Sequence, residues 1–281
     1  MRRLYPVPSA RPAPGAAGSP AAPGSRPPQD PLDPLDGPAS PDALDSLDGL
    51  ADAYAYPDRA AGPWLRANMV ASLDGAAWHE GKSEGLSSAA DLRIFGTLRA
   101  LADVVVVGAG TVRQEGYRPA KAREAFAARR AAAGQSPAPV IAVLSASLDL
   151  DFSLPLFTAP LVPTLILTGA TAPPDRVAAA TKAGAHVITA GDGAGADPVR
   201  AVRELAALGL TRMLHEGGPR LLAQFTAAGV VDELCLTIAP LLTAGDAPRI
   251  MNGPGVSVPE RFSPTLILEE DGFLFTRYTR G

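Results

Sequence analysis

The stretch Val104-Val105-Val106-Val107-Gly108-Ala109-Gly110-Thr111 decides the fold, because an apolar strand ends there in two closely spaced glycines and a segment of helical character follows. A second stretch, Met213-Leu214-His215-Glu216-Gly217-Gly218-Pro219, repeats the pattern. Glycine lets backbone approach a phosphate, and the N–H groups at the start of the following helix point toward it. Two such turns favour a dinucleotide cofactor, whereas either turn alone is more often a tight connection.

The composition is that of a globular chain with no signature of a polyanionic partner. Its 281 residues are 47% apolar and 19% charged, which suffices for one large core or two modest ones. The formal net charge of -4 gives no reason to expect nucleic acid. No apolar run approaches the roughly 20 residues of a membrane span, and the basic start lacks the apolar segment of a secretory signal.

The cysteine and histidine content argues against disulfides and metals. Cys235 is the single cysteine and lies in an apolar run, so a buried, inert thiol and a cytoplasmic location are expected. The three histidines, His79, His186 and His215, show no metal-ligand spacing. The sequence therefore predicts no metal site.

Three regions follow one another along the chain. Residues 1–41 are rich in Pro, Ala, Gly and Ser and are predicted to form a flexible tail, from which Leu4 and Tyr5 can still dock on the body. Residues 42–60 form a short helical lead-in that stops at Pro57. Residues 61–281 form one domain, without an internal repeat or a second linker.

Strands and helices alternate through this domain, which predicts an α/β fold with a mostly parallel sheet covered on both faces. Strands are expected at 64–71, 103–107, 139–144, 164–168, 185–189, 211–214, 232–239, 264–270 and 273–279. Helices are expected at 88–101, 120–133, 174–183, 197–208 and 218–228. Asp271-Gly272 joins the last two strands as a hairpin, so the sheet is mixed with an antiparallel C-terminal edge.

Glu216 is the side chain hardest to dismiss as structural. It follows a central strand at its carboxyl end, where open α/β sheets bind ligands, and a carboxylate there accepts hydrogen bonds from ring N–H and amino groups. The alternative is an ion pair across the cleft with Arg99, which ends the helix that Ser88 caps. Arg99 itself is either a phosphate-binding arginine or a surface one.

These motifs, in this order, resemble the pyrimidine reductase domain of riboflavin biosynthesis, which has a dihydrofolate-reductase-like fold. The resemblance covers residues 64–280 and rests on Ala71-Ser72-Leu73-Asp74-Gly75, Ser83, Leu98-Arg99-Ala100, Gly108-Ala109-Gly110-Thr111-Val112, Glu216-Gly217-Gly218, Val231-Asp232-Glu233-Leu234 and Ile238-Ala239-Pro240. Five or more separated motifs in register are far more specific than one.

The resemblance implies NADPH-dependent reduction of 5-amino-6-(5-phosphoribosylamino)uracil to its ribitylamino form. It implies that Ser83 and Arg99 hold the phosphate end of the substrate and Glu216 its pyrimidine, and Glu115 is the candidate for positioning the reacting end or relaying a proton. The implied cofactor contacts are Ala71, Gly108, Gly110, Thr111, Gly217, Gly218, Pro219, Arg220 and Leu221. Arg113 or Arg220 can receive the 2′-phosphate, and the sequence does not choose between them.

Three positions depart from the common family pattern. Asn68 replaces a frequent lysine, Gly85 replaces an aromatic residue that usually flanks the cofactor, and Glu115 replaces an aspartate. These departures leave the NADPH expectation intact and keep two alternatives open. One is a reductase of the same fold that acts on another heterocycle or carbonyl, and the other is a non-catalytic nucleotide-binding protein.

Family resemblance also bears on partners and on the rest of the pathway. Many members carry a zinc deaminase domain whose signature needs a Pro-Cys-x-x-Cys pair, and a sequence with one cysteine is expected to supply only the reduction. Members are often homodimers, and the apolar strand 232–239 and the hairpin edge are the expected places for pairing.

Overall fold

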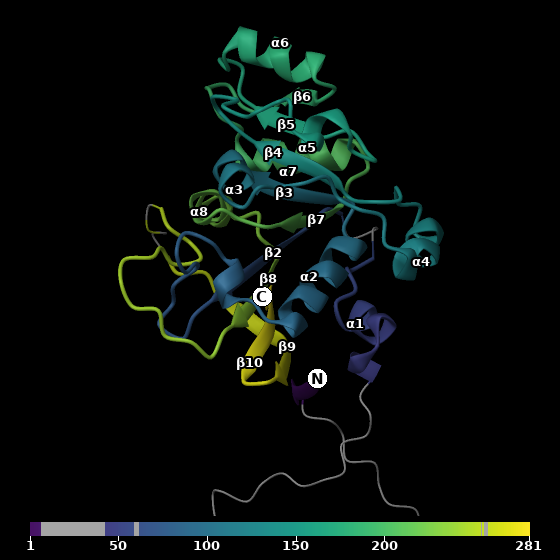
Figure 1. Cartoon of the computed structure of the whole chain (residues 1–281), viewed down its shortest axis with the longest axis vertical. Helices are drawn as coiled ribbons and strands as arrows, with labels where there is room; N and C mark the ends of the chain where they lie inside the picture. Colours follow the sequence, from purple (N-terminus) through teal and green to yellow (C-terminus); the bar gives the residue numbers. More distant parts are fainter. Residues whose placement is uncertain (7–42, 59–61, 254, 256–257) are drawn as a thin grey trace, which may run out of the picture.

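The computed structural model describes residues 1–6, 43–58, 62–253, 255 and 258–281, and shows one sheet with helices on both faces (Figure 1). The strands are β1 (Arg2–Tyr5), β2 (Trp64–Ala71), β3 (Val104–Gly108), β4 (Val140–Leu144), β5 (Leu165–Thr168), β6 (His186–Thr189), β7 (Arg212–His215), β8 (Glu233–Ile238), β9 (Phe262–Glu270) and β10 (Phe273–Arg280). The α-helices are α1 (Leu47–Ala53), α2 (Ala89–Leu101), α3 (Ala109–Gln114), α4 (Ala127–Ala132), α5 (Pro155–Thr158), α6 (Pro174–Lys182), α7 (Pro198–Ala207) and α8 (Pro219–Ala227).

The strand order is β1-β9-β10-β8-β2-β7-β3-β4-β5-β6. From β8 to β6 neighbouring strands are parallel, and β8, β10, β9 and β1 pair antiparallel. The predicted mixed sheet with an antiparallel C-terminal hairpin is therefore confirmed. Each expected strand is present with its ends within two residues of the prediction.

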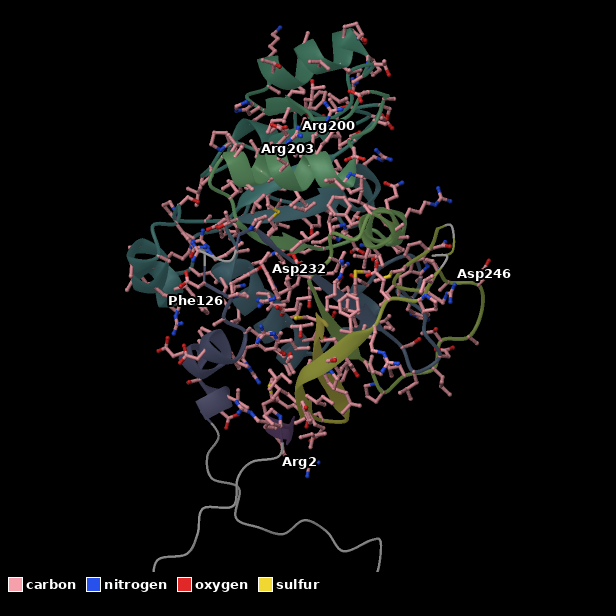
Figure 2. All side chains as sticks on the ribbon, turned by 180° about the vertical axis from the view of Figure 1, so that it is seen from behind. Arg2, Phe126, Arg200, Arg203, Asp232 and Asp246 are labelled. Atoms are coloured by element: carbon pink, nitrogen blue, oxygen red, sulfur yellow. The ribbon has the colours of Figure 1, made fainter. Side chains whose placement is uncertain are left out.

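Alternate residues of the central strands fill two separate cores. Val105 and Val107 of β3 pack with α1, α2, α3, α5 and α6 on one face, and Val104 and Val106 pack with α7 and α8 on the other. All four valines are completely buried, as a strand covered on both faces requires. Figure 2 shows the molecule from behind, with α7 across the sheet.

The expected helix 120–133 is shorter in the structure. A 3-10 turn at Glu124–Phe126 leads into α4, and residues 118–123 are irregular. These residues instead run along a cavity that Arg118, Lys121 and Arg123 line. Tertiary contacts thus override the helical propensity of this segment.

The first residues of the predicted tail form the edge strand β1. It pairs antiparallel with β9, and the Met1 amino group lies 2.7 Å from Asp45 and 3.2 Å from Glu270. Residues 7–41 of that predicted tail lie outside the described residues. In the lead-in, α1 buries Leu50, with Tyr54 buried just after it.

The sheet edges differ from the expected dimer edges. β8 lies between β10 and β2, so the expected edge pairing of strand 232–239 with a second copy is wrong, because both of its sides are already hydrogen-bonded within the chain. The outer edge of the hairpin, β9, is covered by β1 over Ile267–Glu269. Among the described helices, none is long and apolar enough to cross a membrane.

Candidate active site

The two glycine turns meet at the carboxyl ends of adjacent strands. β3 and β7 pair in parallel with Val106 opposite His215, which brings the residues after each strand together. The Gly108 N–H donates to the Gly217 carbonyl at 3.0 Å, and the Glu216 N–H donates to the Val106 carbonyl at 3.0 Å. A cofactor that spans both turns requires this proximity.

The two turns touch most tightly at Gly218, where an added Cβ would clash, and meet at ordinary contact distance at Gly108. A Cβ on Gly218 would lie 2.7 Å from Thr111 Oγ1, and a Cβ on Gly108 would lie 3.6 Å from the Gly218 nitrogen. Gly217 has a φ of +90°, which favours glycine. A Cβ on Gly110 would meet no heavy atom within 4 Å, so this glycine faces open space.

The His215 side chain stabilises the second turn through a hydrogen bond to its backbone. The Gly217 N–H donates to His215 Nδ1 at 3.1 Å, and the ring lies edge-on to Phe225. Burial lowers the pKa of His215 to about 3, so the imidazole is neutral. With Nδ1 as acceptor, the proton resides on the buried Nε2, which has no hydrogen-bond partner. His215 is therefore a support for the turn and not a proton donor to a ligand.

A cavity of about 520 Å³ runs over the two turns. Seven of the predicted cofactor residues line it, namely Gly108, Gly110, Thr111, Gly218, Pro219, Arg220 and Leu221. Asp246, Pro248 and Asn252 from the loop after β8 also line it, and Figure 2 labels Asp246 on that loop. Arg113 does not line this cavity and lies instead against Asp149.

A second cavity of about 200 Å³ adjoins the first. Ser83, Glu115, Glu216, Gly217 and Asn68 line it, and its shared wall with the first cavity consists of Trp78, Thr111, Gln114, Gly218 and Pro219. Ala71 lines neither cavity. It ends β2, is buried and faces Ile238 of the neighbouring strand.

Glu216 is fully engaged within the chain. Arg99 Nε and Nη2 donate to its two carboxylate oxygens at 2.7 and 2.6 Å, and the Tyr117 hydroxyl donates to Oε2. The Glu216 side chain is only 3% exposed. The ion pair that the sequence left as an alternative is thus present, and it occupies the atoms that the resemblance assigns to the substrate.

Electrostatics tie these three side chains together. Burial disfavours the charged form of Arg99, but Glu216 outweighs that effect and raises the pKa of the guanidinium. Burial and the neighbouring Glu216 charge raise the pKa of the Tyr117 hydroxyl, which stays protonated. Arg99 also lies over the Phe95 ring at 4.4 Å and the Tyr117 ring at 5.2 Å. The carboxylate is therefore held in one orientation.

Glu115 joins the substrate-side cavity to a third one. Its Oε1 accepts from the Ser83 backbone N–H at 3.2 Å, and it lines both cavities. The third cavity, about 310 Å³, is rich in cations, and Glu115 is the one carboxylate of its lining. Its basic residues are Arg99, Arg118, Lys121, Arg123 and Arg130. Ser83 and Arg99, expected together at one phosphate, line different cavities, although Glu115 borders both.

Arg130 gives the third cavity a buried donor. It is 2% exposed and donates to the Ala100 and Ala102 carbonyls at 2.8 Å, while its Nη2 has no partner. Arg123 is exposed and its guanidinium covers Gly96 of α2, where an added Cβ would clash with it. The described residues include no group of three or more His, Cys, Asp or Glu suited to a metal.

The sequence profile of the RibD C-terminal domain matches residues 63–270. The chain belongs to this family. A 2,5-diamino-6-ribosylamino-4(3H)-pyrimidinone 5′-phosphate reductase of Methanothermobacter thermautotrophicus is 31% identical over 195 residues, which are 69% of this chain and 86% of that protein. The protein of the same name from Archaeoglobus fulgidus is 28% identical over 200 residues, which are 68% of this chain and 87% of that protein.

Solved structures place the RibD C-terminal domain among pyrimidine reductases in fold as well. A pyrimidine reductase-like protein of Corynebacterium diphtheriae superposes with a TM-score of 0.73 at 28% identity, covering 83% of this chain and 98% of that one. The predicted membership of the riboflavin pyrimidine reductases is thereby confirmed, and the chain is an oxidoreductase. A nicotinamide cofactor is typical of such reductases.

Sequence reasoning gave no role to several residues that line the site of the RibD C-terminal domain. Trp78, Gln114 and Tyr117 line the cavities, and Gln114 donates to the Gly81 carbonyl. Each lies within a few residues of a motif that was recognised. Their position beside the Asp74-Gly75 turn and the Gly110-Thr111 turn is the signal that could have found them, because loops at the carboxyl ends of strands carry ligand contacts.

Proposed function

We propose that this chain uses NADPH to reduce the ribosylamino group of a phosphorylated ribosylamino-pyrimidine to a ribitylamino chain. The observation that carries the proposal is the shared wall between two cavities. One cavity lies over the glycine turns and the other contains Glu216 and Glu115, and Thr111 and Gly218 belong to both. Cofactor and substrate can therefore meet at one place.

The cofactor cavity fits a dinucleotide diphosphate. Gly108 and Gly110 leave its floor free of side chains, and α8 begins at Pro219 with the N–H groups of its first turn unpaired within the helix. Arg220 lines this cavity and Arg113 does not, so we assign the 2′-phosphate of NADPH to Arg220. NADPH, when bound, supplies the hydride, and the chain supplies position and charge.

Glu216 supports recognition of the pyrimidine edge. Its two oxygens already accept paired N–H donors from Arg99, which is the pattern that a ring N–H beside an amino group presents. In 2,5-diamino-6-ribosylamino-4(3H)-pyrimidinone 5′-phosphate that edge carries both donors, and the two archaeal relatives are named for this compound. Substrate binding would require Arg99 to swing from Glu216 toward the cationic cavity.

A second candidate substrate is 5-amino-6-(5-phosphoribosylamino)uracil, which the sequence resemblance implies. It carries a carbonyl at the ring position where the diaminopyrimidinone carries the amino group, so on that edge Glu216 would meet one N–H donor beside an acceptor oxygen. In either case the cavity proposed for the 5′-phosphate is lined by Arg99, Arg118, Lys121 and Arg123. Ser83 lies outside this cavity, and its backbone N–H donates to Glu115, which lines it. Glu115 is placed between the two ends and is the proposed group for relaying a proton.

The test is turnover of both pyrimidines with NADPH and with NADH. We expect loss of reduced-nicotinamide absorbance that depends on the pyrimidine, faster with NADPH, and faster with the diaminopyrimidinone. Calorimetry of NADPH binding to the free protein separates the alternatives. Binding without turnover of either compound points to another heterocycle or carbonyl, and the absence of both binding and turnover overturns the proposal.

We also propose that the protein is a homodimer and, with its single buried cysteine, cytoplasmic. Leu236, Ile238, Leu274 and Tyr278 share one face of β8 and β10, are half-buried and belong to neither core. A second copy is the fitting cover for such a face. Leu236→Glu should halve the mass measured by light scattering, whereas Val199→Glu on exposed α7 should not, and a wild-type monomer contradicts the dimer.

A further inference from the structure

Trp78 belongs to the wall that the two adjoining cavities share. It lines the cavity over the glycine turns and also the cavity that contains Glu216. The backbone fixes it on both sides, because the Ala77 N–H donates to the Pro248 carbonyl at 2.8 Å and the His79 N–H donates to the Lys82 carbonyl at 2.9 Å. The indole is half-buried, so part of its surface faces the cavities.

The aromatic residues of the site divide between its two ends. Phe95 and Tyr117 line the Glu216 cavity and carry the Arg99 guanidinium over their rings. Trp78 is the one aromatic residue among those that line the cofactor cavity. Planar rings that enter from the cofactor side therefore find a single stacking surface.

Position 85, on the same loop, offers no such surface. Gly85 lies under His79, and a Cβ there would be 3.4 Å from the His79 Cβ. The aromatic side chain of this loop is therefore at position 78, seven residues before Gly85, which has no side chain.

We propose that the indole face of Trp78 stacks on the nicotinamide ring and binds the oxidised, cationic ring more tightly than the reduced one. This rests on the proposed use of NADPH. The oxidised nicotinamide carries a positive charge, and the face of an indole attracts cations most strongly among aromatic side chains. The reduced ring is neutral and gains only the stacking contribution. Trp78 accordingly favours the product form of the cofactor.

The chain contains two tryptophans, which makes the proposal measurable without turnover. Trp64 begins β2 and donates its Nε1–H to Glu233 at 2.9 Å, remote from the described cavities. In Trp64→Phe the indole of Trp78 is the sole source of tryptophan emission, and NADP⁺ should quench that emission through contact. In Trp78→Phe only Trp64 remains, and NADP⁺ should leave its emission unchanged.

Affinity gives the second readout. In Trp78→Ala we expect the dissociation constant of NADP⁺ to rise about tenfold and that of NADPH about threefold, as the loss of a stacked and cation-binding ring predicts. Thermal unfolding of Trp78→Ala should match that of Trp78→Phe. Calorimetric binding of NADP⁺ without quenching in Trp64→Phe, or equal effects on both cofactor forms in Trp78→Ala, overturns this inference and leaves the proposed reductase standing. Failure of the wild type to bind either form overturns the proposed function instead.

Discussion

The two glycine turns have the same sequence pattern and opposite packing. At the first turn, Gly110 faces open space. At the second, Gly218 lies against Thr111 and Gly217 has a left-handed conformation, supported by His215. The second turn therefore needs Gly217 for its own backbone and Gly218 for its packing on the Thr111 side chain, whereas Gly110 of the first is needed only if a ligand comes close.

The carboxylates beside the two turns differ in burial and in the number of hydrogen bonds that they accept. Glu115 follows the first turn, is half-buried and accepts a single backbone N–H. Glu216 belongs to the second turn, is 3% exposed and has both oxygens paired. A common pattern has thus produced one adaptable turn and one rigid turn, and the rigid turn carries the better-oriented carboxylate.

The largest expected effect comes from neutralising the carboxylate of the rigid turn. Glu216→Gln should lower kcat/KM about a thousandfold, because the two charge-assisted hydrogen bonds proposed between the pyrimidine edge and the carboxylate, of about 1.5–3 kcal/mol each, are weakened. The measurement is steady-state turnover together with circular dichroism, which should show the fold retained. Glu115→Gln is the matched variant, with an expected loss of about tenfold. Equal losses in the two variants would erase the distinction between the turns.

Acid should weaken the rigid turn selectively. The pKa of His215 is lowered to about 3 by burial, so the folded state binds fewer protons than the unfolded state between about pH 6.5 and 3. Stability should therefore fall as pH drops through this window. His215→Leu should cost about 2 kcal/mol at neutral pH, because the Gly217 N–H loses its acceptor, and should flatten the pH dependence. Urea unfolding across the window measures both, and an unchanged slope in the variant contradicts the assignment.

A methyl group tests the packing of the two turns directly. Gly218→Ala places a Cβ 2.7 Å from Thr111 Oγ1, and we expect an overpacking cost of about 1–2 kcal/mol that appears as roughly tenfold weaker NADPH binding. Removing the hydroxyl by adding Thr111→Ala should recover part of that loss. Gly110→Ala should leave unfolding unchanged, and a destabilised Gly110→Ala protein would contradict the open first turn.

The smallest effect concerns a glycine outside both turns. Gly96→Ala would push its Cβ into the Arg123 guanidinium and displace this cationic side chain from the cavity proposed for the substrate phosphate. We expect KM for the phosphorylated substrate to rise about fivefold and the affinity for NADPH to stay unchanged. Arg123→Ala should raise KM similarly. The double variant should add nothing to either single change, and additive effects would show that Gly96 acts in another way.

Much of the fold was predictable because burial on both faces leaves a strong signal. The runs Val104–Val107 and Val140–Leu144 are apolar throughout, so their strands were located within a residue. The strand Arg2–Tyr5 was not predicted, because four residues with two arginines have no periodicity and are fixed only by pairing with β9. The beginning of the expected helix, residues 120–123, is irregular for the same reason, because tertiary contacts set its conformation.

The candidate site was predictable as a set of turns and less so as a set of contacts. Most of the expected cofactor residues line one cavity because strand ends converge whatever the side chains do. The pairing of Arg99 with Glu216 was visible only as one of two possibilities. Tyr117 and Trp78 reach the site through irregular loops, whose paths depend on distant anchors such as Pro248.

The hydrogen bond from Gly108 to Gly217 also sets the order in which the protein can become competent during synthesis. The first turn emerges from the ribosome long before its partner, and no binding surface exists until β7 has inserted between β2 and β3. A nascent chain truncated before Gly217 would therefore fold, if at all, without help from the cofactor, and two separately expressed halves would have to find each other before either could gain affinity for it.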